Sequence, residues 1–126
     1  MKFSIISPVY LANFERVEQF LRCIQSVKNQ TFKDLPAGQA SFEWVIIDDG
    51  SIEQVNWEEI LKDIRIVLIH KENENRIVAY YEAMQVANGE WFTFLDSDDE
   101  LPPAALETWN NYIEAHPKEK MFNCGA

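Results

Sequence analysis

The chain has 126 residues, a formal net charge of −10 and a composition that is 47% hydrophobic and 13% aromatic. This length suits one domain, and the apolar content is enough to bury a core, which excludes a disordered chain. The charge excludes nonspecific binding to nucleic acid or to an anionic membrane, although a divalent cation can still bridge an acidic protein to an anionic ligand.

The first half of the chain predicts two strands and a long helix. A strand at residues 2–7 is stopped by Pro8, and Asn13 caps a helix that runs to about Lys28. Residues 29–41 form a loop, and residues 42–47 form a strand that is buried on both faces. The apolar face expected for the helix consists of Phe14, Val17, Leu21, Ile24 and Val27.

The second half continues the alternation of strands and helices. Asn56 caps a short helix, residues 65–69 form a strand, residues 76–88 form a helix with Gly89 as its left-handed stop, and residues 90–95 form a strand. Pro102 and Pro103 open a last helix that Pro117 ends, and residues 120–124 begin another strand. The helix at residues 76–88 is expected to bury Ile77, Tyr80, Met84 and Ala87, and the last helix to bury Leu106, Trp109 and Ile113. This order predicts an α/β fold with a parallel sheet and helices on both of its faces.

The cysteines and the apolar runs suggest where the protein is found. Cys23 lies on the apolar side of the first predicted helix and shares no metal-ligand spacing with Cys124, so we expect a buried free thiol and a reducing compartment. Neither a secretory signal nor an apolar run of about 18 residues is present. We expect a cytoplasmic protein, which would reach the cytoplasmic face of a membrane only through further parts of its chain.

Acidic residues follow two of the four predicted strands, where an open α/β sheet binds its ligands. Asp48 and Asp49 follow the second strand, and the segment 96–99 (Asp-Ser-Asp-Asp) follows the fourth. No glycine-rich dinucleotide fingerprint and no P-loop lysine motif is present, which excludes those two ways of binding a nucleotide.

The segment 96–99 has two interpretations. Asp96 and Asp98, separated by the short Ser97, are suited to Mg²⁺ or Mn²⁺, and the ion can bridge to a diphosphate. Alternatively, the segment simply turns the chain and caps the next helix. An EF-hand is excluded because Leu101 stands where its loop requires glycine.

Asp48 and Asp49 also have two interpretations. A carboxylate at the end of a buried strand needs hydrogen-bond donors, and the imide N–H of a uracil ring is a suitable one. The alternative is a turn in which Gly50 takes the left-handed conformation.

Five segments, in order along the chain, resemble the family 2 glycosyltransferases. Residues 5–10 resemble the opening strand and its proline-tyrosine loop, residues 43–51 the Asp-Asp-Gly-Ser turn, and residues 87–99 the strand that leads into the DXD metal motif. Residues 26–32 and 73–83 resemble the end of the first helix and the segment that opens a later one. The resemblance implies a Rossmann-like GT-A fold, a three-layer α/β/α arrangement around a mostly parallel sheet, here truncated.

The family resemblance also implies ligands and roles. Residues 1–126 would be the donor domain, the N-terminal part of a longer chain, and would bind a nucleotide-diphosphate sugar, by family habit a UDP-sugar, with Mn²⁺ or Mg²⁺. Transfer would invert the anomeric carbon. By motif position, the nucleotide would be bound by Pro8, Val9, Tyr10, Asp48, Asp49, Asp96, Ser97 and Asp98, with Asp48 accepting from the base, and the metal by Asp96, Asp98 and Asp99.

Several positions depart from the family pattern. Leu11 and Ala12 come between Tyr10 and Asn13, and two tyrosines at positions 80 and 81 stand where arginine and asparagine are frequent. Arg76 is therefore a candidate for the diphosphate, with a solvated arginine as the alternative. The family's acceptor site and catalytic base lie beyond the metal motif, so no base is assigned and the acceptor is an unspecified glycan, lipid or protein. Apolar surface left uncovered by a missing half favours self-association.

Two other classes of protein compete with this interpretation. A receiver-like signalling domain also places acidic residues around Mg²⁺ at strand ends. This chain does not match that class, because no lysine follows a fifth strand. A catalytically silent nucleotide-binding module derived from a glycosyltransferase would bind the donor without turnover.

Overall fold

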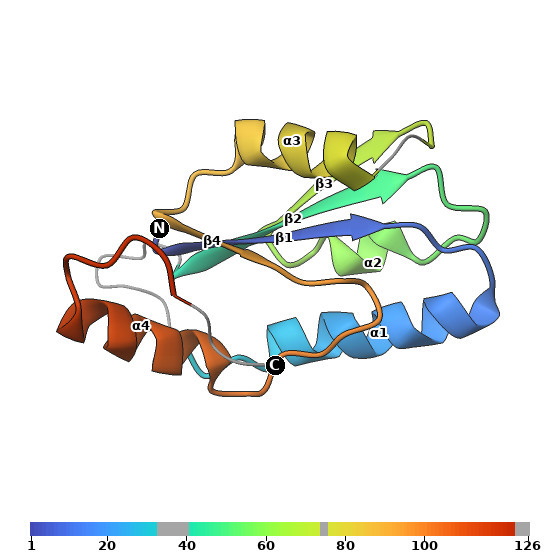
Figure 1. Cartoon of the computed structure of the whole chain (residues 1–126). Helices are drawn as coiled ribbons and strands as arrows, with labels where there is room; N and C mark the ends of the chain where they lie inside the picture. Colours follow the sequence, from blue (N-terminus) through green and yellow to red (C-terminus); the bar gives the residue numbers. More distant parts are fainter. Residues whose placement is uncertain (33–40, 74–75, 123–126) are drawn as a thin grey trace.

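The computed structural model describes residues 1–32, 41–73 and 76–122. Within these residues the elements are β1 (Phe3–Val9), α1 (Phe14–Lys28), β2 (Phe42–Asp49), α2 (Trp57–Ile60), β3 (Ile66–Lys71), α3 (Arg76–Val86), β4 (Trp91–Phe94) and α4 (Ala105–Ala115). All strand pairs are parallel, in the order β3-β2-β1-β4. The helix α3 covers one face of the sheet, and α1, α2 and α4 lie on the other (Figure 1). The predicted parallel, three-layer α/β/α arrangement is confirmed.

The strand β2 forms the centre of the core. All eight of its residues are buried, as expected for a strand covered on both faces. Trp44 and Ile46 join the cluster under α1 and α4, whereas Val45 and Ile47 join the smaller cluster under α3. The strand continues through both Asp48 and Asp49, two residues beyond its predicted end.

The predicted apolar face of α1 is partly wrong. The buried residues of the helix are Phe20, Cys23, Ile24 and Val27, while Phe14 is 74% exposed and Leu21 is 49% exposed. Both sets follow helical spacing and share Ile24 and Val27, so periodicity alone could not choose between the two adjacent stripes. Cys23 is a buried free thiol, as predicted.

The predicted face of α3 is partly wrong: Tyr80 and Ala87 pack against the core as expected, but Ile77 and Met84 are exposed. The helix buries Ala79 and Ala83, four residues apart, against Ile6 and Val45, while Ile77 is 78% exposed. Small side chains let the helix axis approach the sheet closely, so its larger residues are left at the edges of the contact. Hydrophobicity favours the larger side chains, whereas close packing of the helix on the sheet favours alanine.

Pro8 does not stop β1, contrary to the prediction. The strand continues to Val9, and Pro8 pairs in register with Ile47 of β2. The carbonyl of Ile6, two residues before Pro8, accepts from the N–H of Leu95 on the β4 side, so the backbone of Pro8 also faces that side. Pairing with β4 ends opposite Ile6, and the N–H that proline lacks is therefore not needed by the ladder.

Gly89 does not end α3 in the left-handed conformation, contrary to the prediction. It is required because the chain passes very close to β1 at this residue. Among the described glycines only Gly50 has a positive φ, of 71°. A Cβ on Gly89 would lie 2.5 Å from the backbone nitrogen of Ser4. The N–H of Gly89 donates to the Ser4 hydroxyl, which donates to the buried Glu43 carboxylate, and Glu43 also accepts from the N–H of Asn88. This network fixes the start of β4 against β1 and β2.

The remaining boundaries follow the predictions with some corrections. Asn13 and Asn56 cap α1 and α2 as expected. The helix α4 begins at Ala105, after the proline pair, and its N-cap Ala104 makes no side-chain cap; it buries Leu106 and Ile113 as predicted. Residues 120–122 are not in a strand, and the rest of that predicted strand, with Cys124 and most of the predicted loop at 29–41, lies outside the described residues. None of the described helices is both long and apolar enough to span a membrane.

Candidate functional site

A pocket of about 450 Å³ lies at the carboxyl ends of β1 and β4. The chain extends the sheet from β1 to β3 and then places β4 on the other side of β1, so the pocket lies where the strand order reverses. Such a point is the usual ligand site of an open α/β sheet. Of the residues predicted from sequence, the pocket brings together Pro8, Val9, Tyr10, Asp49, Arg76, Asp96, Ser97 and Asp98.

An acidic cluster lies at the β4 side of this pocket; Asp96 and Asp98 line the pocket, and Asp99 lies outside its lining. Asp96, Asp98 and Asp99 each offer a carboxylate oxygen, and these oxygens lie within 4.8 Å of one another. Loss of solvent around Asp99, together with the negative charges of Asp98 and Asp96, raises the pKa of Asp99 above its usual value. Carboxylate oxygens are the ligands that Mg²⁺ and Mn²⁺ prefer, so these three residues could hold such a cation, which would relieve the repulsion between them.

Residues of α1 and of the turn that follows it hold the acidic segment and the residues just after it in place. The Cys23 thiol donates to the carbonyl of Asp96 at 3.7 Å, and the Ser26 hydroxyl accepts from the N–H of Leu101 at 3.0 Å. One turn further on, the Gln30 amide donates to the carbonyl of Pro102 at 2.7 Å. These contacts are to the backbone, so α1 positions the segment without engaging its carboxylates through them.

The thiol of Cys23 has a strongly perturbed environment. Burial, followed by the charge of Asp99 and the other nearby acids, raises the pKa of Cys23 to about 12. A group that stays protonated at physiological pH is a structural donor and not a nucleophile or a metal ligand.

Two arginines flank the acidic cluster. Nη1 of Arg16, in the first turn of α1, lies 3.2 Å from Oδ2 of Asp98. Nη1 of Arg76, at the start of α3, lies 4.0 Å from Oδ1 of Asp96. Both arginines line the pocket, so cationic side chains face it from two different helices.

Asp48 lies apart from the other predicted residues. Its side chain is 5% exposed, with Oδ2 3.0 Å from Nδ1 of His70 and Oδ1 accepting from the N–H of Ser51. It therefore accepts hydrogen bonds as expected, but it does not line the pocket, whereas its neighbour Asp49 does. Gly50 turns the chain beside Asn73, whose amide donates to the carbonyl of Asp49 at 3.1 Å.

Sequence reasoning missed three residues of the pocket and one contact. Ala12, Arg16 and Asn73 line the pocket but had no predicted ligand role. The hydroxyl of Tyr80, which was assigned to a buried face, is 3.5 Å from Asp96 Oδ1. Burial, and then the charge of Asp96, raises the pKa of Tyr80. One signal could have found Arg16: it lies in the first turn of the helix that follows the pocket-lining segment Pro8 to Tyr10.

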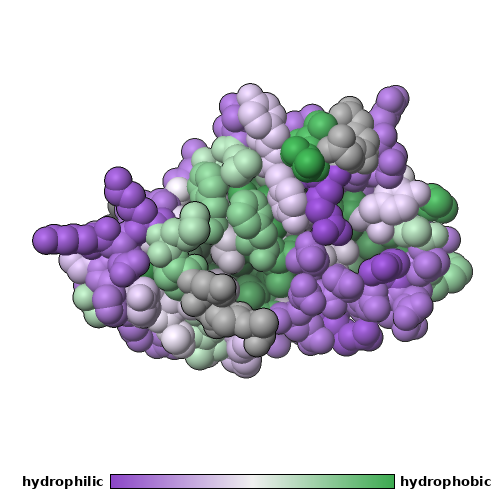
Figure 2. Space-filling view, viewed as in Figure 1, coloured by the Kyte–Doolittle hydropathy of each residue, from purple (hydrophilic) through white to green (hydrophobic). Residues whose placement is uncertain are grey.

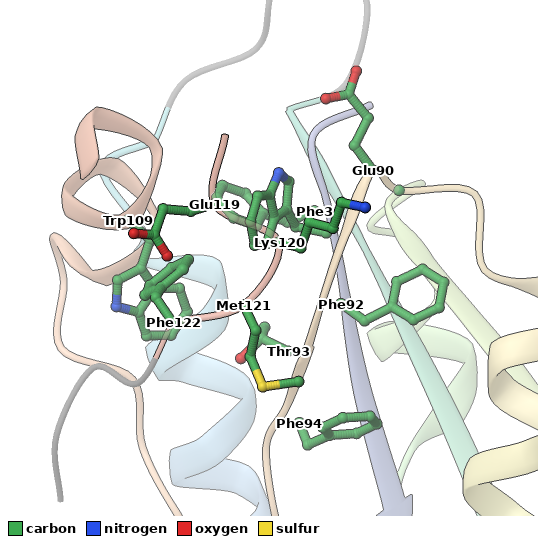
Figure 3. A pocket seen from close by; sticks show the side chains of 12 residues that line it. Phe3, Glu90, Phe92, Thr93, Phe94, Trp109, Glu119, Lys120, Met121 and Phe122 are labelled. Atoms are coloured by element: carbon green, nitrogen blue, oxygen red, sulfur yellow. The ribbon is translucent and has the colours of Figure 1, made fainter. Parts of the chain in front are cut away.

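A larger hollow, of about 790 Å³, lies along β4 and away from the acidic cluster. Figure 2 shows an apolar region on this side of the molecule, between α3 and α4. In Figure 3, Phe92 and Phe94 project from β4 on the side away from Trp109 and Phe122. Phe94 is 53% exposed, and within the described residues β4 is an edge strand. The hollow holds few convergent polar groups, so the smaller pocket is the better candidate for chemistry.

Comparison with known proteins decides the family. The sequence profile described as "Glycosyl transferase family 2" matches residues 4–120. The chain belongs to this family. Its fold is that of a family 2 chain, as the resemblance had implied.

Relatives of this family 2 chain are much longer than it is. An uncharacterized glycosyltransferase of Rickettsia bellii is 35% identical over 126 residues, a match that covers 91% of this chain and 16% of that protein. Glycosyltransferase GlyA of Streptococcus pneumoniae is 34% identical, over 96% of this chain and 18% of that protein. The chain thus spans less than a fifth of the length of these two relatives.

Solved structures share the GT-A fold of this family 2 chain. A crystal structure of S. aureus TarS 1-349 superposes with a TM-score of 0.79 at 26% identity, covering 93% of this chain and 33% of that one. The complex of TarS 1-349 with UDP gives a TM-score of 0.78 at 25% identity, covering 100% of this chain and 38% of that one. TarS 1-349 has also been crystallised with UDP-GlcNAc, and that structure gives a TM-score of 0.73.

Proposed function

We propose that this chain is the donor-binding domain of an inverting glycosyltransferase and that its pocket binds a UDP-sugar through Mn²⁺ or Mg²⁺. The observation that carries the proposal is the acidic cluster of Asp96, Asp98 and Asp99 beside the pocket at the carboxyl ends of β1 and β4. Family membership and the UDP and UDP-GlcNAc complexes of the similar TarS chain support the choice of ligand.

The proposed division of labour follows the position of each residue. Pro8, Val9 and Tyr10, at the end of β1, would contact the nucleoside, with Asp49 beside them. The base contact of Asp48 is proposed from its motif position alone, since its carboxylate lies outside the pocket and is bound by His70 and Ser51. Asp96 and Ser97 would approach the ribose, while Asp98 and Asp99 would hold the metal. Arg76 would bind the diphosphate, because its guanidinium faces the pocket from the start of α3.

The chemistry proposed for this site is stabilisation of the leaving group. A bound divalent ion would neutralise the charge that develops on the diphosphate as the sugar leaves. Arg76 would add a charge-assisted hydrogen bond to the same group. Inversion also requires a base near the acceptor hydroxyl. We assign no such base, and we propose that acceptor binding and the base belong to a longer chain, which the length of the relatives supports.

Calorimetry with UDP tests the donor site. We expect binding in the presence of Mn²⁺ or Mg²⁺ and strong loss of affinity in a chelator, because an acidic pocket repels a diphosphate without a bridging cation. Equal UDP affinity with metal and with chelator would exclude the metal role. Failure to bind UDP, GDP or any nucleotide-sugar in a thermal-shift panel would exclude the donor function as a whole.

A transfer assay separates the proposal from its closest alternative. We expect the 126-residue chain to bind the donor but not to transfer sugar, since it lacks an assigned base and acceptor site. A longer protein that contains this chain should transfer the sugar. Donor binding without turnover by that longer protein would favour a catalytically silent nucleotide-binding module.

A further inference from the structure

Arg16 faces the acidic cluster from the helix that follows β1. Its Nη1 lies 3.2 Å from Oδ2 of Asp98, and the two side chains are 48% and 42% exposed. The residues are 82 positions apart in the sequence, so the contact is created by the fold. The ion pair occupies a carboxylate oxygen of the cluster that could hold a cation.

The charges around the cluster suit the exchange of this ion pair for ligands. Asp96, Asp98 and Asp99 contribute three negative charges, and Arg16 and Arg76 contribute two positive ones. A divalent cation and the diphosphate of a nucleotide-sugar carry opposite charges of equal size, so together they leave the net charge of the site unchanged. Binding of either ligand alone would change the net charge of the site.

The Arg16–Asp98 pair is also of a kind that can be exchanged. A half-exposed ion pair is weakly held, because water screens both charges. A guanidinium presents planar donors that match phosphate oxygens, and it keeps its charge in both states. The backbone N–H of Arg16 is already bound by the Asn13 side chain at 3.0 Å, so the side chain can move without disturbing the helix cap.

We propose that Arg16 is a diphosphate-binding residue that exchanges partners. It pairs with Asp98 in the ligand-free protein, and it turns to the diphosphate when a divalent cation takes Asp98. This inference rests on the proposed donor site. It has a consequence of its own: Arg16 opposes the cation when the cation binds alone and favours the nucleotide when both bind. Arg16 therefore couples the two binding events, and by linkage each ligand tightens the other.

Arg16→Gln tests the exchange because it should change two affinities in opposite directions. Calorimetry with Mn²⁺ alone should show binding that is about two- to fivefold tighter than in the wild type, since a half-exposed ion pair no longer competes. Calorimetry with UDP at saturating Mn²⁺ should show binding about tenfold weaker, because a charged hydrogen bond to the diphosphate is lost. The enhancement of Mn²⁺ affinity by UDP should shrink accordingly.

Two further variants serve as controls. Arg22→Gln removes an exposed arginine of the same helix that does not line the pocket, and we expect both affinities to stay near those of the wild type. Arg16→Lys keeps the charge but loses the planar fork, so Mn²⁺ affinity should stay near the wild-type value while UDP affinity falls. Thermal unfolding of each variant checks that the fold is retained.

The outcomes separate this inference from the donor site itself. If the wild type binds UDP with Mn²⁺ but Arg16→Gln matches Arg22→Gln in either affinity, the exchange of partners is wrong and the donor site stands. Weaker Mn²⁺ binding in Arg16→Gln would likewise overturn the exchange. If the wild type binds neither Mn²⁺ nor UDP, the donor site and the exchange are both wrong.

Discussion

Replacing Asp98 with asparagine removes one charge from the acidic cluster at nearly constant side-chain size. Asp98 is 42% exposed and its described partner is the half-exposed Arg16, so the effect on folding should stay within about 0.5 kcal/mol. The effect on a bound cation should be larger. In a water-like dielectric, a divalent ion about 2.1 Å from a carboxylate oxygen is attracted by about 4 kcal/mol, part of which dehydration takes back.

We therefore expect Asp98→Asn to weaken Mn²⁺-dependent UDP binding by about 1.4–2.8 kcal/mol, which is tenfold to a hundredfold. Calorimetry with UDP, with Mn²⁺ or with chelator, measures the change, and thermal unfolding shows whether the fold is kept. The matched control is Glu100→Gln, which removes the same charge from the same segment at an exposed residue outside the cluster. If Asp98→Asn and Glu100→Gln bind UDP equally well in Mn²⁺, the assignment of Asp98 as a metal ligand is refuted.

Four other predictions can each be tested separately. Asp48→Ala should weaken UDP binding about tenfold and leave inorganic diphosphate binding nearly unchanged, because the residue is assigned to the base; equal losses in calorimetry would remove it from that role. The raised pKa of Cys23, about 12, leaves less thiolate at any given pH, so iodoacetamide at about pH 8 should label it roughly a thousandfold more slowly than an ordinary thiol, measured in a Cys124→Ser background. Rapid labelling of the folded protein would contradict this burial. Gly89→Ala should destabilise the fold by about 1–3 kcal/mol in urea titration, because a Cβ would lie 2.5 Å from the Ser4 nitrogen, and the exposed neighbour Asn88→Ala serves as control. Phe94→Ser should reduce concentration-dependent self-association in sedimentation, since its side chain is 53% exposed on an edge strand, and a wild-type chain that is monomeric at all concentrations would show that this surface does not associate.

The order of the elements could be predicted from sequence because local patterns determine it. Runs of branched residues, helical spacing and capping asparagines indicate strands and helices without knowledge of their partners, and both caps, at Asn13 and Asn56, are confirmed. The acidic strand ends could be predicted for a similar reason. In a parallel sheet all carboxyl ends lie at one edge, so Asp49 and Asp96 had to come near Tyr10 once the sheet was known to be parallel.

The buried faces of the helices could not be predicted, because periodicity defines a stripe but not the surface that it meets. On α3, two alanines are buried and Ile77 is exposed, since the closest approach to the sheet is made where the side chains are small. The roles of Pro8 and Gly89 also depend on neighbouring strands and so could not be predicted. Pro8 is tolerated because β4 stops pairing before it, and Gly89 is required because the chain passes close to Ser4.

The detailed geometry of the site was likewise decided by the tertiary structure. The sequence by itself determined the acidic segment, its family and its place after a strand. It did not indicate that Asp48 turns to His70, or that Arg16, 82 residues from Asp98, pairs with it. Contacts between residues so far apart depend on how helices pack against the sheet, and that packing arises from the shapes of many side chains together and not from any local pattern.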